Sequence, residues 1–128
     1  MKPETKEWIA KAIADFSTAQ REVKVVDNPN YDAVCFHAQQ AAEKYLKAII
    51  IESGRCVPRT HDLEVLVNLL TDQLSDLNQI LHNARILSAM AVEVRYPGMS
   101  ADEDDAVQSL KSTIIIFDAV REILQGSE

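Results

Sequence analysis

Apolar residues recur every three or four positions along most of this chain, which is the spacing that places them on one face of a helix. The first such segment runs from about Glu4 to Val26, and Asp27-Asn28-Pro29-Asn30 ends it because proline cannot continue a helix. Its expected core face consists of Ile9, Ala12, Ile13, Phe16, Ala19, Val23 and Val26.

The second segment, from about Tyr31 to Ser53, is apolar around much of its circumference, and Gly54 is a suitable stop. So narrow a polar strip predicts a central helix that neighbours cover on more than one side. Its widest apolar face contains Val34, Cys35, Ala38, Ala42, Tyr45, Leu46 and Ile49, with Phe36 and Ile50 beside it.

Three further helices are expected after the loop 54–60. A short one starts near Thr60, a suitable N-cap, and carries Leu63, Leu66, Val67 and Leu70. A longer one runs from about Leu74 to Val94, where the sequence 95–98 ends it, and the last follows the acidic run 102–105 and stops before Gly126. The apolar positions of these last two helices are Leu77, Ile80, Leu81, Ala84, Leu87, Ala91, Val94, Val107, Leu110, Ile114, Phe117, Val120 and Leu124.

Composition agrees with this helical pattern, because three glycines and four prolines are too few for a sheet with many turns. We therefore predict an all-α fold, an antiparallel up-and-down four-helix bundle with one additional short helix, forming a single domain over residues 1–128.

The formal charge of −7 makes extended nucleic acid and anionic membrane surfaces unfavourable partners. No apolar run approaches the roughly 20 residues of a membrane helix, and the charged first residues lack a signal-peptide core, so we expect a cytoplasmic protein. His37, His61 and His82 are scattered singly and no glycine-rich phosphate loop is present, so we expect no metal and no cofactor. Cys35 and Cys56 form no Cys-x-x-Cys pair and are expected to be reduced.

Four motifs in order along the chain resemble one protein family. The segment 35–48, Cys-Phe-His-Ala-Gln-Gln-Ala-Ala-Glu-Lys-Tyr-Leu-Lys-Ala, resembles the signature helix of HEPN (higher eukaryotes and prokaryotes nucleotide-binding) domains. His61-Asp62-Leu63 with Leu66 resembles the His-Asp-Leu of that family, and Arg95-Tyr96-Pro97 resembles the Arg-Tyr-Pro of one branch. In the first helix, the matching positions are Trp8, Ala12, Asp15 and Ala19.

The resemblance implies a small helical bundle that is commonly a homodimer and often works beside a minimal nucleotidyltransferase. It also implies that some relatives are metal-independent ribonucleases, acting as toxins, in which an arginine is followed after four to six residues by a histidine. Arg95 lies where that arginine is expected, but no histidine follows it, and the last histidine is His82. Cleavage of RNA needs a proton acceptor near neutral pH, so this absence weakens the ribonuclease hypothesis.

Three groups of residues are candidates for binding a nucleotide or a partner. Arg95 and Tyr96 could hold a phosphate and a base, or could simply end a helix. The second group, a stripe on one face of the second helix, could bind an anion or an acidic partner surface, or could be a solvated strip; it contains His37, Gln40, Lys44 and Lys47. The third is a small basic cluster in the following loop, formed by Arg55, Arg59 and His61.

The leading hypothesis is a non-catalytic HEPN module that homodimerises and binds a minimal nucleotidyltransferase, a nucleotide, or both, within a toxin–antitoxin pair. The first alternative is a ribonuclease toxin that uses Arg95 with another base, such as His61 or His37. The second is a dimeric helical scaffold without a ligand.

Overall fold

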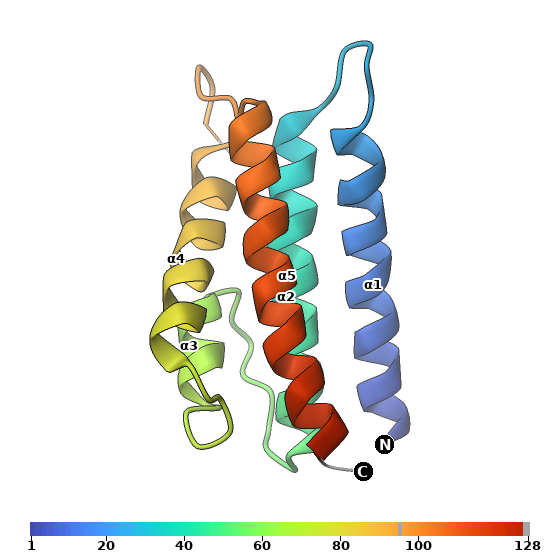
Figure 1. Cartoon of the computed structure of the whole chain (residues 1–128), viewed down its shortest axis with the longest axis vertical. Coiled ribbons are helices and arrows are strands. Elements are labelled where there is room, and N and C mark those ends of the chain that lie inside the picture. Colours follow the sequence, from blue (N-terminus) through green and yellow to red (C-terminus); the bar gives the residue numbers. More distant parts are fainter. Residues whose placement is uncertain (95, 127–128) are drawn as a thin grey trace.

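The computed structural model describes residues 1–94 and 96–126, and over these residues it contains helices and no strand. The four long helices are α1 (Pro3–Val23), α2 (Tyr31–Glu52), α4 (Leu77–Glu93) and α5 (Glu103–Gly126), and α3 (Leu63–Asn68) is short. The long helices alternate in direction, and both termini lie at the same end of the bundle (Figure 1). These observations confirm the predicted fold class. None of the helices in the described part of the chain is both long and apolar enough to span a membrane.

The starts of α3 and α4 differ from the prediction because aspartates cap both helices. Asp62, not Thr60, is the N-cap of α3, and its carboxylate accepts a hydrogen bond from a backbone N–H of the first turn. Thr60 lies two residues before this cap, and its hydroxyl accepts a hydrogen bond from the backbone N–H of Asp62 at 3.1 Å. Likewise Asp76 caps α4, so this helix begins after the buried Leu74 rather than at it.

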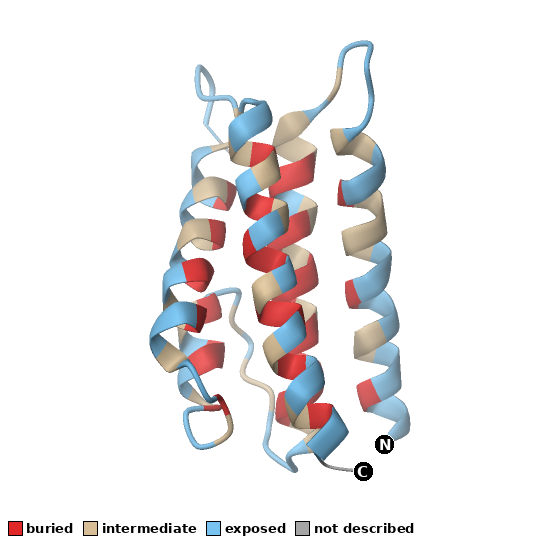
Figure 2. Ribbon diagram, in the orientation of Figure 1, coloured by how far each residue is buried: buried red, intermediate tan, exposed pale blue. Residues whose placement is uncertain are grey.

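The central position predicted for the second helix is confirmed, since α2 packs against α1, α3, α4 and α5. Buried residues follow one another along nearly its whole length (Figure 2). Phe36 is the exception, with 41% of its surface exposed, because it lies beside the polar strip rather than on the covered side.

Three other residues expected in the core are exposed. Ile13 of α1 and Ile114 of α5 lie on parts of these helices that no neighbour covers, and Val26 follows the end of α1. Periodicity predicts the direction of an apolar face but not how wide a strip the neighbours cover.

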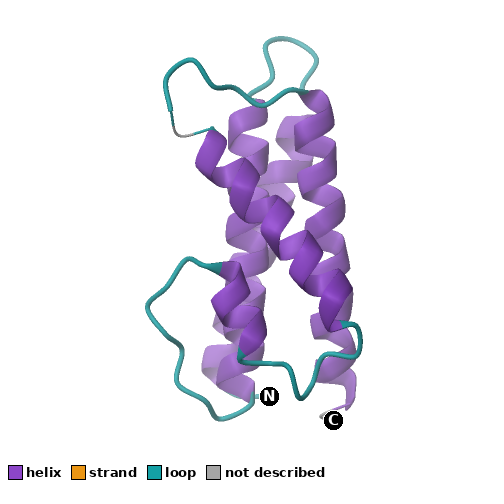
Figure 3. Cartoon of the chain, turned by 90° about the vertical axis from the view of Figure 1, so that its left-hand side faces the viewer, coloured by secondary structure: helices purple, strands orange, loops and turns teal. Residues whose placement is uncertain are grey.

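The connection between α2 and α3 follows a path along the side of the bundle. It leaves the end of the bundle that carries the termini and runs back along the bundle before α3 begins (Figures 1 and 3). This path brings His61, at the end of the connection, beside Glu43 in the middle of α2.

Candidate functional site

The predicted stripe on α2 exists, but acidic residues divide it into two neutralised groups. The first group is held by Asp15 of α1. One oxygen of this carboxylate lies 2.9 Å from Nδ1 of His37, and the other lies 2.5 Å from Nζ of Lys44. Both side chains therefore join α1 to α2, and the charge of Lys44 is paired within the protein rather than free for an external anion.

The second group is held by Glu43, which is buried with 3% of its side chain exposed. Its Oε2 lies 3.1 Å from Nζ of Lys47, and that ammonium group also lies 5.6 Å from the centre of the Trp8 ring. A buried carboxylate and a buried ammonium need each other, because an unpaired charge in an apolar environment is costly. Lys47 therefore stabilises the interior rather than offering a charge to a ligand.

Glu43 also orients His61. Nδ1 of His61 lies 3.1 Å from both carboxylate oxygens. An ionised carboxylate only accepts hydrogen bonds, so Nδ1 carries the proton and Nε2 keeps its lone pair. Since 78% of the His61 side chain is exposed, Nε2 is accessible on the side of the ring away from Glu43.

Two glutamines complete this network. Nε2 of Gln39 donates to Oε1 of Glu43 at 3.2 Å and to the backbone carbonyl of His61 at 3.3 Å. Gln40, a predicted site residue, donates in turn to the side-chain oxygen of Gln39 at 2.9 Å. Gln40 thus acts through Gln39, and the network ties the connection before α3 to α2.

A pocket of about 310 Å³ lies beside this network. Residues of α2, α4 and the start of α3 surround it, namely Gln39, His61, Asp62, Ser88, Ala91 and Val92. The pocket thus combines an imidazole, a hydroxyl and an apolar wall with one carboxylate. We call it the α2–α4 pocket.

Two residues of the predicted basic cluster of Arg55, Arg59 and His61 contact carboxylates. Arg55 is engaged elsewhere, since its guanidinium lies 2.8 Å from Asp72 and donates to the backbone carbonyl of Leu69. Arg59 is exposed, and no ion pair involves it among residues 1–94 and 96–126. Arg55 and His61 therefore contact different carboxylates, Asp72 and Glu43.

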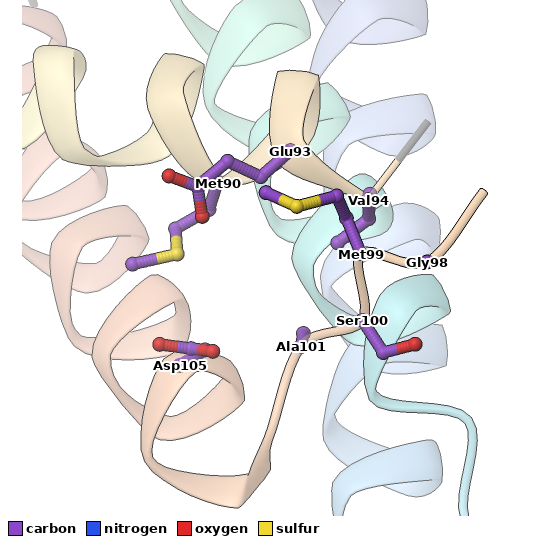
Figure 4. Close-up of a pocket in the computed structure, with 8 residues that line it drawn as sticks. All are labelled: Met90, Glu93, Val94, Gly98, Met99, Ser100, Ala101 and Asp105. Carbon is purple, nitrogen blue, oxygen red and sulfur yellow. The ribbon is translucent and has the colours of Figure 1, made fainter. Parts of the chain in front are cut away.

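Arg95, the remaining predicted cation, lies outside the described residues. The next residue, Tyr96, is exposed. The backbone carbonyl of Tyr96 accepts a hydrogen bond from the backbone N–H of Met99 at 3.1 Å. A second pocket, of about 180 Å³, lies close by, between the end of α4 and the start of α5 (Figure 4). Two carboxylates, Glu93 and Asp105, line this pocket, and no described cation does, which disfavours a phosphate there.

A comparison with protein-family models matches the HEPN domain over residues 5–123, which is nearly the whole chain. The chain belongs to the HEPN family. The resemblance seen in the four sequence motifs is therefore confirmed.

Solved structures of two proteins are similar to this HEPN chain over its length. TT1696 from Thermus thermophilus has a TM-score of 0.82 and 22% identity, covering 95% of this chain and 99% of that one. ST0689, an archaeal HEPN homologue, has a TM-score of 0.72 and 26% identity, covering 95% of this chain and 98% of that one. The curated proteins contain no match.

The potential metal ligands of this HEPN fold are dispersed. Within residues 1–94 and 96–126 no group of three or more His, Cys, Asp or Glu side chains is placed to hold a metal ion. The two cysteines are free thiols, with Cys35 buried and Cys56 exposed.

Sequence analysis of this HEPN chain missed the acidic partners of its candidate cations. Glu43 is four residues before Lys47 and four after Gln39, so helical spacing alone could have indicated that pair. No local signal links Asp15 to Lys44 or Glu43 to His61, because these contacts join different parts of the chain. Ser88 likewise lines the same pocket as His61 only because α4 packs on α2.

Proposed function

We propose that this HEPN protein is a non-catalytic module that homodimerises and binds a partner protein of the minimal nucleotidyltransferase class. The observation that carries the proposal is the contrast between neutralised charges and uncovered apolar side chains. The candidate cations of α2 contact Asp15 and Glu43 within the protein. Phe36 and Val92, in contrast, are 41% and 48% exposed.

These two apolar residues lie around the α2–α4 pocket. Val92 lines it, and Phe36 is on α2 one turn before Gln39, which also lines it. Large apolar side chains at the surface are the kind of residue that a protein interface covers. A protein surface therefore suits this face better than a nucleotide, whose phosphates would require unpaired cations.

Homodimerisation is tested by light scattering coupled to size exclusion at micromolar concentrations. Phe36→Glu and Val92→Glu place a charge on the proposed face, and each should shift the wild-type dimer toward monomer. Ile114→Glu is the matched control, because Ile114 is 43% exposed but lies on α5. A dimer that withstands both charges, or that Ile114→Glu disrupts equally, would contradict the proposed face.

Partner binding is tested by co-expression with a nucleotidyltransferase encoded beside the gene, a neighbour that a toxin–antitoxin pair would have. The proposal expects both proteins to co-elute from the column. Nucleotides are tested separately by the melting temperature, since a ligand that prefers the folded state must raise it. Separate elution and an unchanged melting temperature would leave a dimeric scaffold without a ligand.

One observation favours a ribonuclease as the second candidate. The Glu43–His61 contact supplies an oriented imidazole that could replace the histidine missing after Arg95. Metal-free cleavage of RNA by the purified protein, lost in both Arg95→Ala and His61→Ala, would support this candidate. Cleavage that persists in either variant would count against it.

A further inference from the structure

We propose that His61 is a nucleophile in the α2–α4 pocket, that Glu43 is its positioning residue, and that the pocket hydrolyses small, uncharged carboxylic esters. This activity goes beyond binding a partner protein and belongs to the chain whose α2–α4 pocket no partner covers, because Val92 lines the pocket and is also part of the proposed face. The proposal rests on three features of the described structure, which are the orientation of the ring, the balance of charge around it, and the groups that line the pocket.

The orientation of the ring makes one nitrogen available. Both oxygens of Glu43 lie 3.1 Å from Nδ1 of His61, which fixes the proton there and leaves the lone pair on Nε2. A carboxylate that orients an imidazole in this way is the usual support for a histidine that takes part in catalysis. The other histidines differ, because His37 is more covered beside Asp15, and His82 on α4 has no carboxylate within ion-pair distance in the described structure.

The balance of charge keeps the ring suited to this role. Glu43 faces the ammonium group of Lys47 at 3.1 Å, so the carboxylate has a counter-ion besides its contact with the ring. Gln39 donates both to Glu43 and to the backbone carbonyl of His61, which holds the carboxylate and the connection together. The imidazole is therefore fixed at its base and exposed at its reactive nitrogen.

The lining of the pocket indicates the class of substrate. Ser88 presents a hydroxyl that no other described side chain engages, and this hydroxyl can donate to the carbonyl oxygen of an ester. Ala91 and Val92 provide an apolar wall, and a volume of about 310 Å³ suits a small molecule. Asp62 adds a negative charge, which disfavours phosphorylated compounds and other anions.

The reaction has two steps. Nε2 adds to the carbonyl carbon, the bond from this carbon to the leaving oxygen breaks, and an alkoxide departs with the electron pair. Water then adds to the acyl carbon, the carbon–nitrogen bond breaks, a carboxylic acid leaves, and the other proton of the water passes to Nε2, which makes the ring an imidazolium. The imidazolium ring returns its extra proton to the alkoxide, so that one ester and one water give one acid and one alcohol. During both steps Glu43 holds the proton on Nδ1.

The probe for this activity is p-nitrophenyl acetate, whose leaving group is coloured. His61→Ala should lower kcat/KM about a hundredfold, the lower end of the effect of a positioned acid–base group. His82→Ala is the matched control and should leave the rate unchanged, since His82 is an exposed histidine outside the pocket. Rapid quenching followed by mass spectrometry should find one acetyl group on His61. A rate that survives His61→Ala, or that falls equally in His82→Ala, would overturn the proposal.

Two more variants test the nucleophile and its positioning residue separately. The side-chain amide of His61→Gln can still donate to Glu43 and hold the connection, yet this variant should be as inactive as His61→Ala. Glu43→Gln should change the pH profile of kcat, because a neutral amide can accept the Nδ1 hydrogen bond but cannot stabilise the imidazolium as a carboxylate does. An unchanged pH profile would contradict the positioning role. None of these measurements reports the oligomeric state, so their failure leaves the proposed module untouched, whereas confirmed hydrolysis would overturn its non-catalytic description.

Discussion

Asp15 of α1 and Lys44 of α2 form an ion pair with 2.5 Å between Oδ2 and Nζ, and the other oxygen of Asp15 contacts His37. One carboxylate on the first helix thus holds a lysine and a histidine of the second. We expect Asp15→Asn to lower the free energy of unfolding by about 1.5–3 kcal/mol, the usual value of hydrogen bonds to a charged group. Urea unfolding measures this difference.

The control for Asp15 is Asp118→Asn. Asp118 forms an exposed pair with Arg121 on α5, at 3.2 Å. Exposed pairs of this kind contribute about 0–1 kcal/mol, so the control should remain close to wild type. Equal losses in the two variants would show that the Asp15 contacts add nothing beyond an ordinary surface pair.

The buried pair of Glu43 and Lys47 should show strong coupling. Glu43→Leu alone leaves a buried ammonium without a partner, which we expect to cost about 3–5 kcal/mol. Lys47→Met alone should also destabilise, because it leaves the carboxylate with His61 and Gln39 only. The double variant should recover much of the loss, since replacing both members of a buried pair with apolar residues is often close to neutral. A double-mutant cycle in urea measures the coupling, and simple additivity would contradict it.

The helices and the family could be predicted from sequence because both depend on local patterns. Periodic apolar residues indicated all five helices, and short motifs such as His61-Asp62-Leu63 indicated the HEPN family. The helix starts were less accurate, since Thr60 and Asp62 are both good caps and only the folded chain selects between them.

The candidate site was harder to predict, because its side chains are defined by contacts between distant segments. The four residues predicted on α2 do share one side of the helix, but three of them contact the carboxylate of Asp15 or Glu43 within the protein. No pattern within α2 reveals that Asp15 approaches from α1, or that His61 returns along the bundle to Glu43. The distinction between a binding stripe and an internal network therefore requires the tertiary structure.

Glu52 should contribute to the loss of stability in acid. A hydrogen bond from the backbone N–H of Lys2, followed by one from the Thr5 hydroxyl, lowers the pKa of Glu52 below its ordinary value of 4.5. The folded state thus binds this proton less tightly than the unfolded state. The stabilisation is complete above the ordinary pKa and is lost as the pH falls through the lower, folded pKa.

Glu52→Gln tests this pH dependence. Between about pH 7 and about pH 3 the variant should lose less stability than wild type, because it has no carboxylate to protonate. Glu122→Gln, an exposed residue of α5, is the control and should follow the wild-type pH dependence. Urea unfolding at the two pH values measures both. If Glu52→Gln also follows wild type, the hydrogen bonds from Lys2 and Thr5 do not favour the ionised carboxylate.

The two thiols should react at very different rates. Burial raises the pKa of the Cys35 thiol above its ordinary value, and nearby carboxylates such as Asp105 raise it further, against the opposite effect of the Ser109 hydroxyl. The thiolate is the reactive form, so Cys35 should react with a disulfide reagent such as DTNB only after unfolding. Cys56 is exposed and should react in the native protein. Cys56→Ala should abolish the fast reaction, and a fast reaction that remains would place Cys35 at the surface.

The close contact between α1 and α2 depends on small residues. Ala12 of α1 is fully buried in the same core cluster as Ala38, Ala41 and Ala42 of α2. Ala12→Leu adds volume where the two helices meet, which we expect to cost about 1–3 kcal/mol through strained side chains and a displaced backbone. Ala10→Leu is the matched control, because Ala10 is an exposed position on the same helix, where leucine is nearly as good a helix former as alanine. Urea unfolding should therefore separate the two variants, and equal stabilities would mean that α1 has room to move away from α2.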